Sequence, residues 1–305
     1  MSRHVVTISE LGDDDLRAIL ESARAPLDDS LFVGQGVALV FERPSLRTRA
    51  ACSTAVHELG GYVTFFGDDE IGLDSRESAE DVGRTIDALY SVCAMRIRQH
   101  SVFRRIRNAT MDRLSLINLL SDVAHPTQAI ADVLTIADHF AKGDPSQLAG
   151  LRVAYVGDVT NVARSLAVAL TRLGVEVIVG APDGYQLTAG TDEDPLAVEG
   201  AKLRLTSSAT EAVRGADVVY TDAWVSMGFE EEVHRRRADL ASFRVDEALL
   251  EAASSKAIVL HCLPAHRGDE ITDGVMDGPH SLVWQQVAHR RSAMVGALRW
   301  IKDGD

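Results

Sequence analysis

Residues 37–49 read VALVFERPSLRTR, and this stretch decides the fold of the chain. The apolar run Val37–Phe41 predicts a buried strand, Pro44 marks a tight turn, and helix-compatible residues follow. A helix that begins at such a turn exposes unpaired N–H groups and a partial positive charge, which attract anions. Arg47 and Arg49 add planar donors that fit phosphate or carboxylate oxygens. The stretch therefore predicts a bound phosphate-like group.

Apolar runs alternate with amphipathic helical segments along all 305 residues. The expected strands are Val37–Phe41, Tyr62–Phe66, Val92–Ile97, Ser115–Leu119, Leu151–Val156, Val175–Val179, Val218–Thr221 and Ala257–Leu260. The expected helices are Ser9–Ala25, Ala79–Ser91, His125–Ala141, Val162–Leu173 and Ser281–Lys302. Strands that alternate with helices imply parallel sheets covered on both faces. We therefore predict an α/β protein of two doubly wound domains, each a parallel sheet flanked by helices, joined by interdomain helices.

The composition is that of an ordinary globular protein, with 46% hydrophobic and 25% charged residues. A formal net charge of -14 argues against nucleic acid as a partner, because nucleic-acid binding depends on Lys and Arg side chains that neutralise phosphates. No apolar run is long enough to span a bilayer, and the first residues do not resemble a signal peptide. The three cysteines lack metal-site and disulfide spacings, so we expect a cytoplasmic protein with neither a zinc site nor a disulfide framework. No metal or cofactor is expected.

Polar residues follow the expected strands of the first half, where ligands bind in open α/β sheets. Arg96 ends a buried strand and needs a carboxylate or a ligand anion as its partner. His125 and Gln128 lie three residues apart at a helix start, so they could both donate to a carbonyl oxygen or simply cap the helix. Arg47 and Arg49 could pair with nearby acids instead of a ligand, and Arg49 could be a structural arginine that points away.

A second group follows the strands of the other half. The turn before Asn161 has a single glycine, which disfavours a dinucleotide site, and Asn161 would cap the next helix. Asp222 could neutralise an amine and Ser226 could bind a polar ligand, or both could satisfy a turn. Cys262 could be a small buried side chain or a nucleophile. We expect its neighbour His261 on the opposite side of an extended strand, which disfavours a Cys-His pair.

Together these motifs resemble the carbamoyltransferases in order and spacing, and most closely the ornithine carbamoyltransferases. The motifs are Ser45-Leu46-Arg47-Thr48-Arg49, His125-Pro126-Thr127-Gln128, Asp222 with Ser226-Met227-Gly228, and His261-Cys262-Leu263-Pro264-Ala265. The resemblance runs essentially from end to end. It implies a carbamoyl phosphate-binding domain over residues 1–145, completed by the C-terminal helix at about 285–305, and an ornithine-binding domain over residues 146–284.

The resemblance also implies which residues form each site. The carbamoyl phosphate site would comprise Ser45, Leu46, Arg47, Thr48, Arg96, His125, Gln128, Cys262, Leu263 and Arg290. The catalytic residues would be Arg47, Arg96, His125 and Cys262. The ornithine site would comprise Asn161, Asp222, Ser226 and Met227. Cys262 would then line the amine site rather than act as a nucleophile.

Some positions depart from the family pattern. Leu46 stands where the family motif has threonine, so it would contribute only its backbone N–H. Ala50-Ala51-Cys52 replaces the usual Ser-Phe-Glu, and Ala288-His289-Arg290 replaces Glu-Asn-Arg. Gly72 lies about where the family often has a glutamine near the phosphate, in a loop that completes a neighbouring subunit's site.

The implied reaction transfers the carbamoyl group of carbamoyl phosphate to the δ-amine of ornithine, which gives citrulline and phosphate for arginine biosynthesis. The implied assembly is a homotrimer, with neither a nucleic acid nor a membrane as partner. One alternative is a carbamoyltransferase for putrescine or an N-acylornithine, which Thr127 allows. Another is a non-catalytic relative that binds carbamoyl phosphate without turnover. An NAD-dependent dehydrogenase is disfavoured by the missing glycine fingerprint.

Overall fold

The apolar run after Gln35 forms strand β1 (Gly36–Phe41), and the arginine-rich motif begins helix α2 (Leu46–Glu58). All six residues of β1 are buried, as expected for a central strand covered on both faces. Ser45 is the N-cap of α2, with extended backbone angles and a side chain that accepts from a backbone N–H of the first turn. The predicted order of strand, turn and helix is therefore confirmed.

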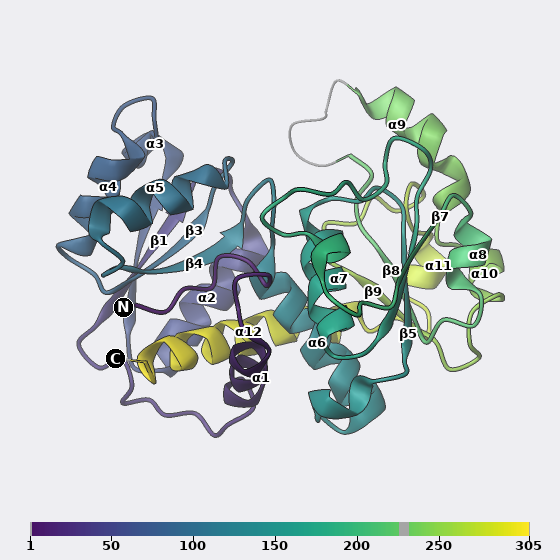
Figure 1. Ribbon diagram of the computed structural model, residues 1–305, viewed down its shortest axis with the longest axis horizontal. Coiled ribbons are helices and arrows are strands. Elements are labelled where there is room, and N and C mark those ends of the chain that lie inside the picture. The colour runs from purple at the N-terminus through teal and green to yellow at the C-terminus, as the bar shows by residue number, and fades with distance from the viewer. Residues whose placement is uncertain (1, 226–231, 305) are drawn as a thin grey trace. The chain divides into compact units, whose positions relative to one another are not determined.

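Figure 1 shows the computed structural model, which describes residues 2–225 and 232–304. The chain divides into two units, Met1–Ala131 with Ala288–Asp305, and Asp132–Val287. Each unit is built on its own parallel sheet, in agreement with the predicted α/β class.

The first unit contains a parallel four-stranded sheet in the order β2-β1-β3-β4. Its strands are β1 (Gly36–Phe41), β2 (Tyr62–Gly67), β3 (Val92–Arg96) and β4 (Ser115–Leu120). Its helices are α1 (Asp13–Ser22), α2 (Leu46–Glu58), α3 (Asp68–Ile71), α4 (Ala79–Asp87) and α5 (Ser101–Thr110). Two longer helices, α6 (Pro126–Ala141) and α12 (Val283–Lys302), contain the boundaries between the units.

Helices α4 and α5 cover one face of this sheet. Val82 and Ile86 of α4 join Val102 and Phe103 of α5 in one apolar cluster with alternate residues of β1, β3 and β4. Burial of such side chains contributes about 1.5–3 kcal/mol each and is the main force that holds the sheet and helices together.

The end of the chain returns to the first unit through α12, which passes close to α1. A Cβ atom built on Gly296 of α12 would lie 2.3 Å from the carbonyl oxygen of Ile19 in α1. Only glycine fits this approach without a shift of one helix. The C-terminal helix therefore completes the first unit and carries Arg290 there.

The second unit contains a parallel five-stranded sheet in the order β7-β6-β5-β8-β9. Its strands are β5 (Arg152–Val156), β6 (Glu176–Gly180), β7 (Leu203–Thr206), β8 (Val218–Thr221) and β9 (Ile258–His261). Its helices are α7 (Asn161–Arg172), α8 (Ala209–Val213), α9 (Val233–Leu240), α10 (Glu247–Leu250) and α11 (Asp273–Met276), with 3-10 turns η1 (Pro145–Leu148), η2 (Pro195–Ala197) and η4 (Ala241–Phe243).

Both faces of strands β5, β6 and β8 in the second sheet are buried. Helices α8 and α11 pack with one set of strand residues, among them Ala154 and Val219. On the opposite set, the rings of Tyr155 and Tyr220 stack with centroids 5.7 Å apart. Most residues of α7 are buried on all sides, as its apolar sequence predicts.

All predicted strands are present with ends shifted by at most a residue or two, and the long helices are present as well. The first helix is shorter than the predicted Ser9–Ala25, because α1 spans Asp13–Ser22 with Gly12 as its N-cap. Strand β7 (Leu203–Thr206) was not predicted, because it is a short edge strand with exposed positions. Helix α4 ends at Asp87, four residues before the predicted end at Ser91, because the chain leaves the helix in a turn before β3 begins.

Candidate active site

Polar residues gather at the carboxyl ends of the strands in each unit. In the first unit Ser45 follows β1, Arg96 ends β3 and His125 follows β4. Parallel strands end at one edge of their sheet, which is where open α/β sheets bind ligands. We call this group the anion cluster, which consists of Ser45, Arg47, Thr48, Arg96, His125, Gln128 and Arg290.

Thr48 connects two parts of the anion cluster. The side chain of Ser45 accepts from the backbone N–H of Thr48 at 3.4 Å, and its hydroxyl donates to Thr48 Oγ1 at 2.9 Å. Arg290 of α12 donates from Nη2 to the same Oγ1 at 2.7 Å, and its side chain is largely buried. These bonds hold a guanidinium group beside the N-terminus of α2, where the helix itself favours an anion.

The two arginines of the opening motif have different environments. The guanidinium carbon of Arg49 lies 3.7 Å from the centroid of the Phe65 ring, a cation–π contact. Arg47 is half-buried, and its Nε is a buried donor without a hydrogen-bond partner among the described residues. A buried donor without a partner costs free energy that a ligand oxygen would recover. Leu46 leaves its side chain 80% exposed, so only its backbone is placed to interact.

His125 lies directly before α6 and is electrically neutral in this setting. Burial lowers its pKa well below the usual value, and the nearby charges of Arg290 and Arg96 lower it further. The backbone N–H of Gln128 donates to the carbonyl oxygen of His125 at 3.1 Å, in the first turn of α6. Arg96, His125 and Gln128 are all buried. A neutral imidazole can donate one N–H to a carbonyl oxygen, so this group can polarise a carbonyl.

The departure at Cys52 adds no negative charge to the anion cluster. Burial raises the pKa of the Cys52 thiol to about 12, against the smaller opposing effect of Arg290. The thiol therefore stays protonated at neutral pH and does not neutralise Arg290.

At position 72, where the family often has a glutamine, the backbone conformation favours the glycine found here. Gly72 ends α3 in the left-handed region with φ of 53°, and a Cβ there would lie 2.9 Å from the Cβ of Arg76. The loop that follows is fastened by Arg105, which donates to both oxygens of Asp74 and both oxygens of Glu80. A glutamine at position 72 would require a different path for this loop.

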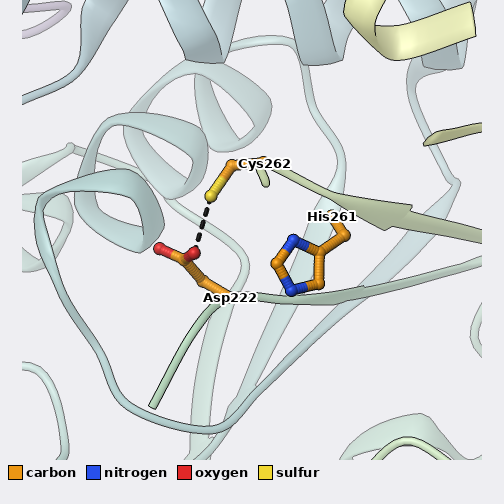
Figure 2. A group of neighbouring side chains, drawn as sticks. All are labelled: Asp222, His261 and Cys262. Atoms are coloured by element: carbon orange, nitrogen blue, oxygen red, sulfur yellow. Dashed lines mark hydrogen bonds between the residues drawn. The ribbon is translucent and has the colours of Figure 1, made fainter. Parts of the chain in front are cut away.

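In the second unit, Asp222 follows β8 and Cys262 follows β9, and their side chains meet (Figure 2). The Cys262 thiol donates to Asp222 Oδ1 at 2.6 Å, and the backbone N–H of Ala223 donates to the same oxygen at 2.7 Å. Burial raises the pKa of Asp222, while His261 and these hydrogen bonds oppose the rise. A buried carboxylate of this kind favours a cationic ligand, which would offset the cost of desolvating the charge.

The prediction that His261 and Cys262 point to opposite sides is wrong. One ligand atom from each of Asp222, His261 and Cys262 lies within 4.8 Å of the others, and Figure 2 shows the three side chains as one group. Strand β9 ends at His261, so strand alternation no longer applies at Cys262. The chain turns at Leu263, which has φ of 60° and donates its backbone N–H to His261 Nδ1 at 2.8 Å.

These three side chains include the residue types that bind transition metals, but both ring nitrogens of His261 already have partners. Nδ1 accepts from the backbone of Leu263, and Nε2 lies 3.2 Å from Glu270 Oε1. A metal would have to displace one of these bonds to reach a ring lone pair. The arrangement therefore favours a polar substrate site over a metal centre.

Asn161 is not the helix cap that the sequence predicted. Thr160 occupies the N-cap position of α7, and Asn161 is the first helical residue. The side-chain oxygen of Asn161 accepts from the backbone N–H of Val162 at 2.9 Å. Ser226 and Met227, the other predicted ornithine ligands, lie outside the described residues.

A buried ion pair in the second unit was not predicted. Arg236 of α9 donates from Nη1 to Asp158 Oδ2 at 2.6 Å and to the carbonyl oxygen of Trp224 at 3.2 Å. Its Nε donates to Glu232 Oε2 at 3.0 Å. Arg236 belongs to a run of three arginines, which the sequence alone presents as an exposed charged helix face. Only its burial distinguishes it from its neighbours.

Comparison with known proteins identifies the family of the chain. Residues 3–138 match the carbamoyl-P binding domain, and residues 149–301 the Asp/Orn binding domain, of aspartate/ornithine carbamoyltransferase. An ornithine carbamoyltransferase of Pyrobaculum islandicum is 39% identical over 300 residues, which cover 94% of this chain and 95% of the relative. The solved ornithine carbamoyltransferase from Pyrococcus furiosus superposes with a TM-score of 0.89 at 32% identity and covers 100% of this chain and 98% of its own. The structure from Thermus thermophilus gives 0.87 at 32% identity, with 99% of each chain covered.

One α/β unit carries a cluster of arginine side chains at its strand ends, and the other carries a buried carboxylate. The chain belongs to the aspartate/ornithine carbamoyltransferase family and is a carbamoyltransferase. The resemblance that the motifs indicated is therefore confirmed. Among the described helices, none is long and apolar enough to cross a membrane.

Proposed function

We propose that this enzyme transfers the carbamoyl group of carbamoyl phosphate to the δ-amine of L-ornithine and releases citrulline and phosphate. The observation that carries the proposal is the anion cluster, in which Arg290 is fixed on Thr48 beside the N-terminus of α2 and Arg47 keeps a buried donor without a partner among the described residues. The names of the relatives and solved structures support ornithine as the acceptor.

In this proposal the anion cluster binds carbamoyl phosphate. Ser45, Thr48 and the backbone at Leu46 bind phosphate oxygens at the start of α2, and Arg47 and Arg290 pair with the phosphate charge. Arg96, His125 and Gln128 bind the carbamoyl group. His125 is suited to this part because its pKa is lowered and the ring stays neutral, so it donates to the carbonyl oxygen without carrying a charge.

Asp222 and Asn161 bind the amino-acid end of ornithine in this proposal, together with Ser226 and Met227. The buried carboxylate of Asp222 attracts the α-ammonium group, and the Cys262 thiol holds the carboxylate in place. Cys262 and Leu263 contact the carbamoyl group, and the thiol does not act as a nucleophile.

The reaction then needs no covalent intermediate with the protein. The neutral δ-nitrogen attacks the carbonyl carbon and a C–N bond forms. The C–O bond to phosphate then breaks, and phosphate leaves with the electron pair and takes up the proton that the nitrogen releases. Negative charge grows on the carbonyl oxygen and on the leaving phosphate, where Arg47 and Arg96 stabilise it. One well-placed donor of this kind is worth about 3–4 kcal/mol, and alignment of the two substrates supplies much of the rest.

The proposed setting is arginine biosynthesis in the cytoplasm, with the enzyme assembled as a homotrimer. The proposed domains are residues 1–145, completed by the C-terminal helix at about 285–305, for carbamoyl phosphate and residues 146–284 for ornithine. Light scattering of the purified protein measures the assembly directly, and a monomer or dimer at working concentration would contradict the trimer.

An amine panel tests the reaction. Purified enzyme is mixed with carbamoyl phosphate and L-ornithine, putrescine or N-acetylornithine, and both the carbamoylated product and phosphate are measured. We expect rapid citrulline formation from ornithine and little product from the other amines. If putrescine or N-acetylornithine reacts faster, that amine is the acceptor in place of ornithine. If no amine gives product over a range of pH, the protein is a non-catalytic member of the family.

A further inference from the structure

A buried pair of side chains behind Cys262 has no part in the proposed reaction. The side chains of His261 and Glu270 are both 0% exposed, and His261 Nε2 lies 3.2 Å from Glu270 Oε1. Glu270 follows β9 in the chain by nine residues, and its Oε1 also accepts from the backbone N–H of His266. Burying a carboxylate completely costs free energy, so we looked for a functional role that would offset the cost of this pair.

The two hydrogen bonds of the ring fix the position of its proton. Nδ1 of His261 accepts from the backbone N–H of Leu263 at 2.8 Å, so it cannot carry a proton itself. The ring is therefore neutral, its proton lies on Nε2, and Nε2 donates to Glu270. Glu270 selects this tautomer because a carboxylate only accepts.

Leu263 depends on that acceptor. Its φ of 60° lies in the left-handed region, which strains a non-glycine residue unless the surroundings hold it there. With the proton on Nδ1, the ring would present an N–H to the N–H of Leu263, and two donors would face each other. The Cys262–Leu263 segment would then lose the contact that holds its turn.

Other contacts of His261 fix the residue but not the proton. The backbone N–H of His261 donates to Gln286 Oε1 at 3.0 Å, and Gln286 in turn donates to Asp132 Oδ1 at 2.6 Å. These bonds are the same for either tautomer. Among the described residues, Glu270 is the only partner recorded for Nε2.

We propose that Glu270 is a positioning residue that acts through the proton of His261 to hold Cys262 and Leu263 in their reactive arrangement, an inference that rests on the proposed function of these two residues. Loss of the Glu270 acceptor lowers kcat for citrulline formation by about tenfold, the effect of one lost hydrogen bond expressed in the transition state. Glu270→Gln retains an oxygen acceptor and keeps most of the activity.

A double-mutant cycle separates this role from a general effect on folding. In His261→Asn, the side-chain oxygen can accept from the N–H two residues later without any choice of tautomer. We expect Glu270→Met to reduce kcat in the wild-type background and to have little further effect in the His261→Asn background. An equal loss of kcat in both backgrounds would overturn the proposal, since Glu270 would then act independently of His261.

Two further variants show whether a loss of kcat reflects the role of Glu270 or a general loss of folded protein. Asp269→Asn changes the neighbouring acid, which pairs with Arg237 near the surface, and leaves kcat unchanged. Glu270→Asp keeps the charge but withdraws it from the ring by one methylene, so it serves if Glu270→Met does not fold, and we expect it to lower kcat as well. Wild-type kcat in a folded Glu270→Met or Glu270→Asp variant would contradict the role.

The imidazole proton can also be observed without turnover. In ¹⁵N-labelled enzyme, the His261 signals, assigned by their loss in His261→Asn, report an Nε2–H tautomer, and Glu270→Met or Glu270→Asp shifts them toward a mixture. Unchanged signals in both variants would refute the role of Glu270 whatever the activity. Absence of citrulline from wild-type enzyme would instead refute the proposed function, and the spectra would still decide the tautomer.

Discussion

Asp222→Asn separates substrate binding from stability, because the two hydrogen bonds that the Asp222 side chain accepts within the described residues both end on one oxygen. Cys262 Sγ and the backbone N–H of Ala223 donate to Oδ1 at 2.6 and 2.7 Å. An asparagine can place its amide oxygen there, so the variant keeps both bonds and loses only the charge. Breaking a buried pair of opposite charges costs about 3–5 kcal/mol, so we expect kcat/KM for ornithine to fall by at least about a hundredfold.

The same substitution has the opposite effect on stability at neutral pH. Burial raises the pKa of Asp222 above its usual 3.8, so the folded protein keeps this proton at pH values where the unfolded chain has released it. Stability therefore falls as pH rises from the ordinary pKa through the raised one. Asparagine does not ionise and escapes this loss. The variant should match wild type below pH 3.8 and exceed it at neutral pH.

Two measurements test these expectations. Initial rates over a range of ornithine concentrations give kcat/KM, and thermal unfolding from acid to neutral pH gives the stability difference. Asp183→Asn, at an exposed position, serves as the control and should alter neither. An unchanged kcat/KM for ornithine would show that Asp222 does not bind the amine. A variant less stable than wild type at neutral pH would show that the carboxylate is compensated in the free enzyme.

Four further substitutions, of which Arg49→Ala is a control, test the first unit. Arg47→Ala should raise KM for carbamoyl phosphate by about a hundredfold through loss of a charged hydrogen bond. Arg49→Ala removes the ring contact that is the only one found for this side chain within the described residues, and it should leave KM unchanged. Equal effects of the two substitutions in initial-rate assays would disprove the distinction. Thr48→Val removes the hydroxyl that joins Arg290 to Ser45 and should lower kcat/KM for carbamoyl phosphate about tenfold, so wild-type kinetics would rule out this connection. Gly296→Ala places a Cβ 2.3 Å from a carbonyl oxygen and should cost about 1–3 kcal/mol in chemical denaturation; an unchanged midpoint would mean that α1 moves freely.

The fold could be predicted largely because its strands are continuous apolar runs. Both faces of a parallel sheet are covered, so strands such as Val37–Phe41 and Val218–Thr221 need no alternation to be recognised. Strand β7 (Leu203–Thr206) lies at the edge of its sheet, where exposed positions accept an arginine and the apolar run disappears. Such a strand forms because it pairs with its neighbour β6. The hydrophobic pattern of residues 203–206 alone does not indicate that pairing.

Part of the candidate site rests on residue type alone, and its assignment stays a prediction. Arg96, His125 and Asp222 stand at strand ends, and the type of each side chain limits what it can bind. The orientation of His261 was predicted wrongly, because the strand ends one residue earlier than strand alternation assumed. Arg236 was missed because its burial depends on contacts with Asp158 and Trp224, far from it in sequence.

At this site the sequence indicates which residues can carry a charge, but it does not indicate where the protons lie. The sequence places arginines in one half of the chain and Asp222 in the other, from which we predict an anionic and a cationic substrate. It does not reveal that His125 is neutral, that Asp222 holds its proton more tightly than usual, or that the proton of His261 lies on Nε2. Each of these properties follows from burial and from one neighbouring group, such as Glu270 beside His261. Because these protonation states decide which atoms donate and which accept, catalysis in this enzyme should be most sensitive to substitutions that change them while leaving the fold intact.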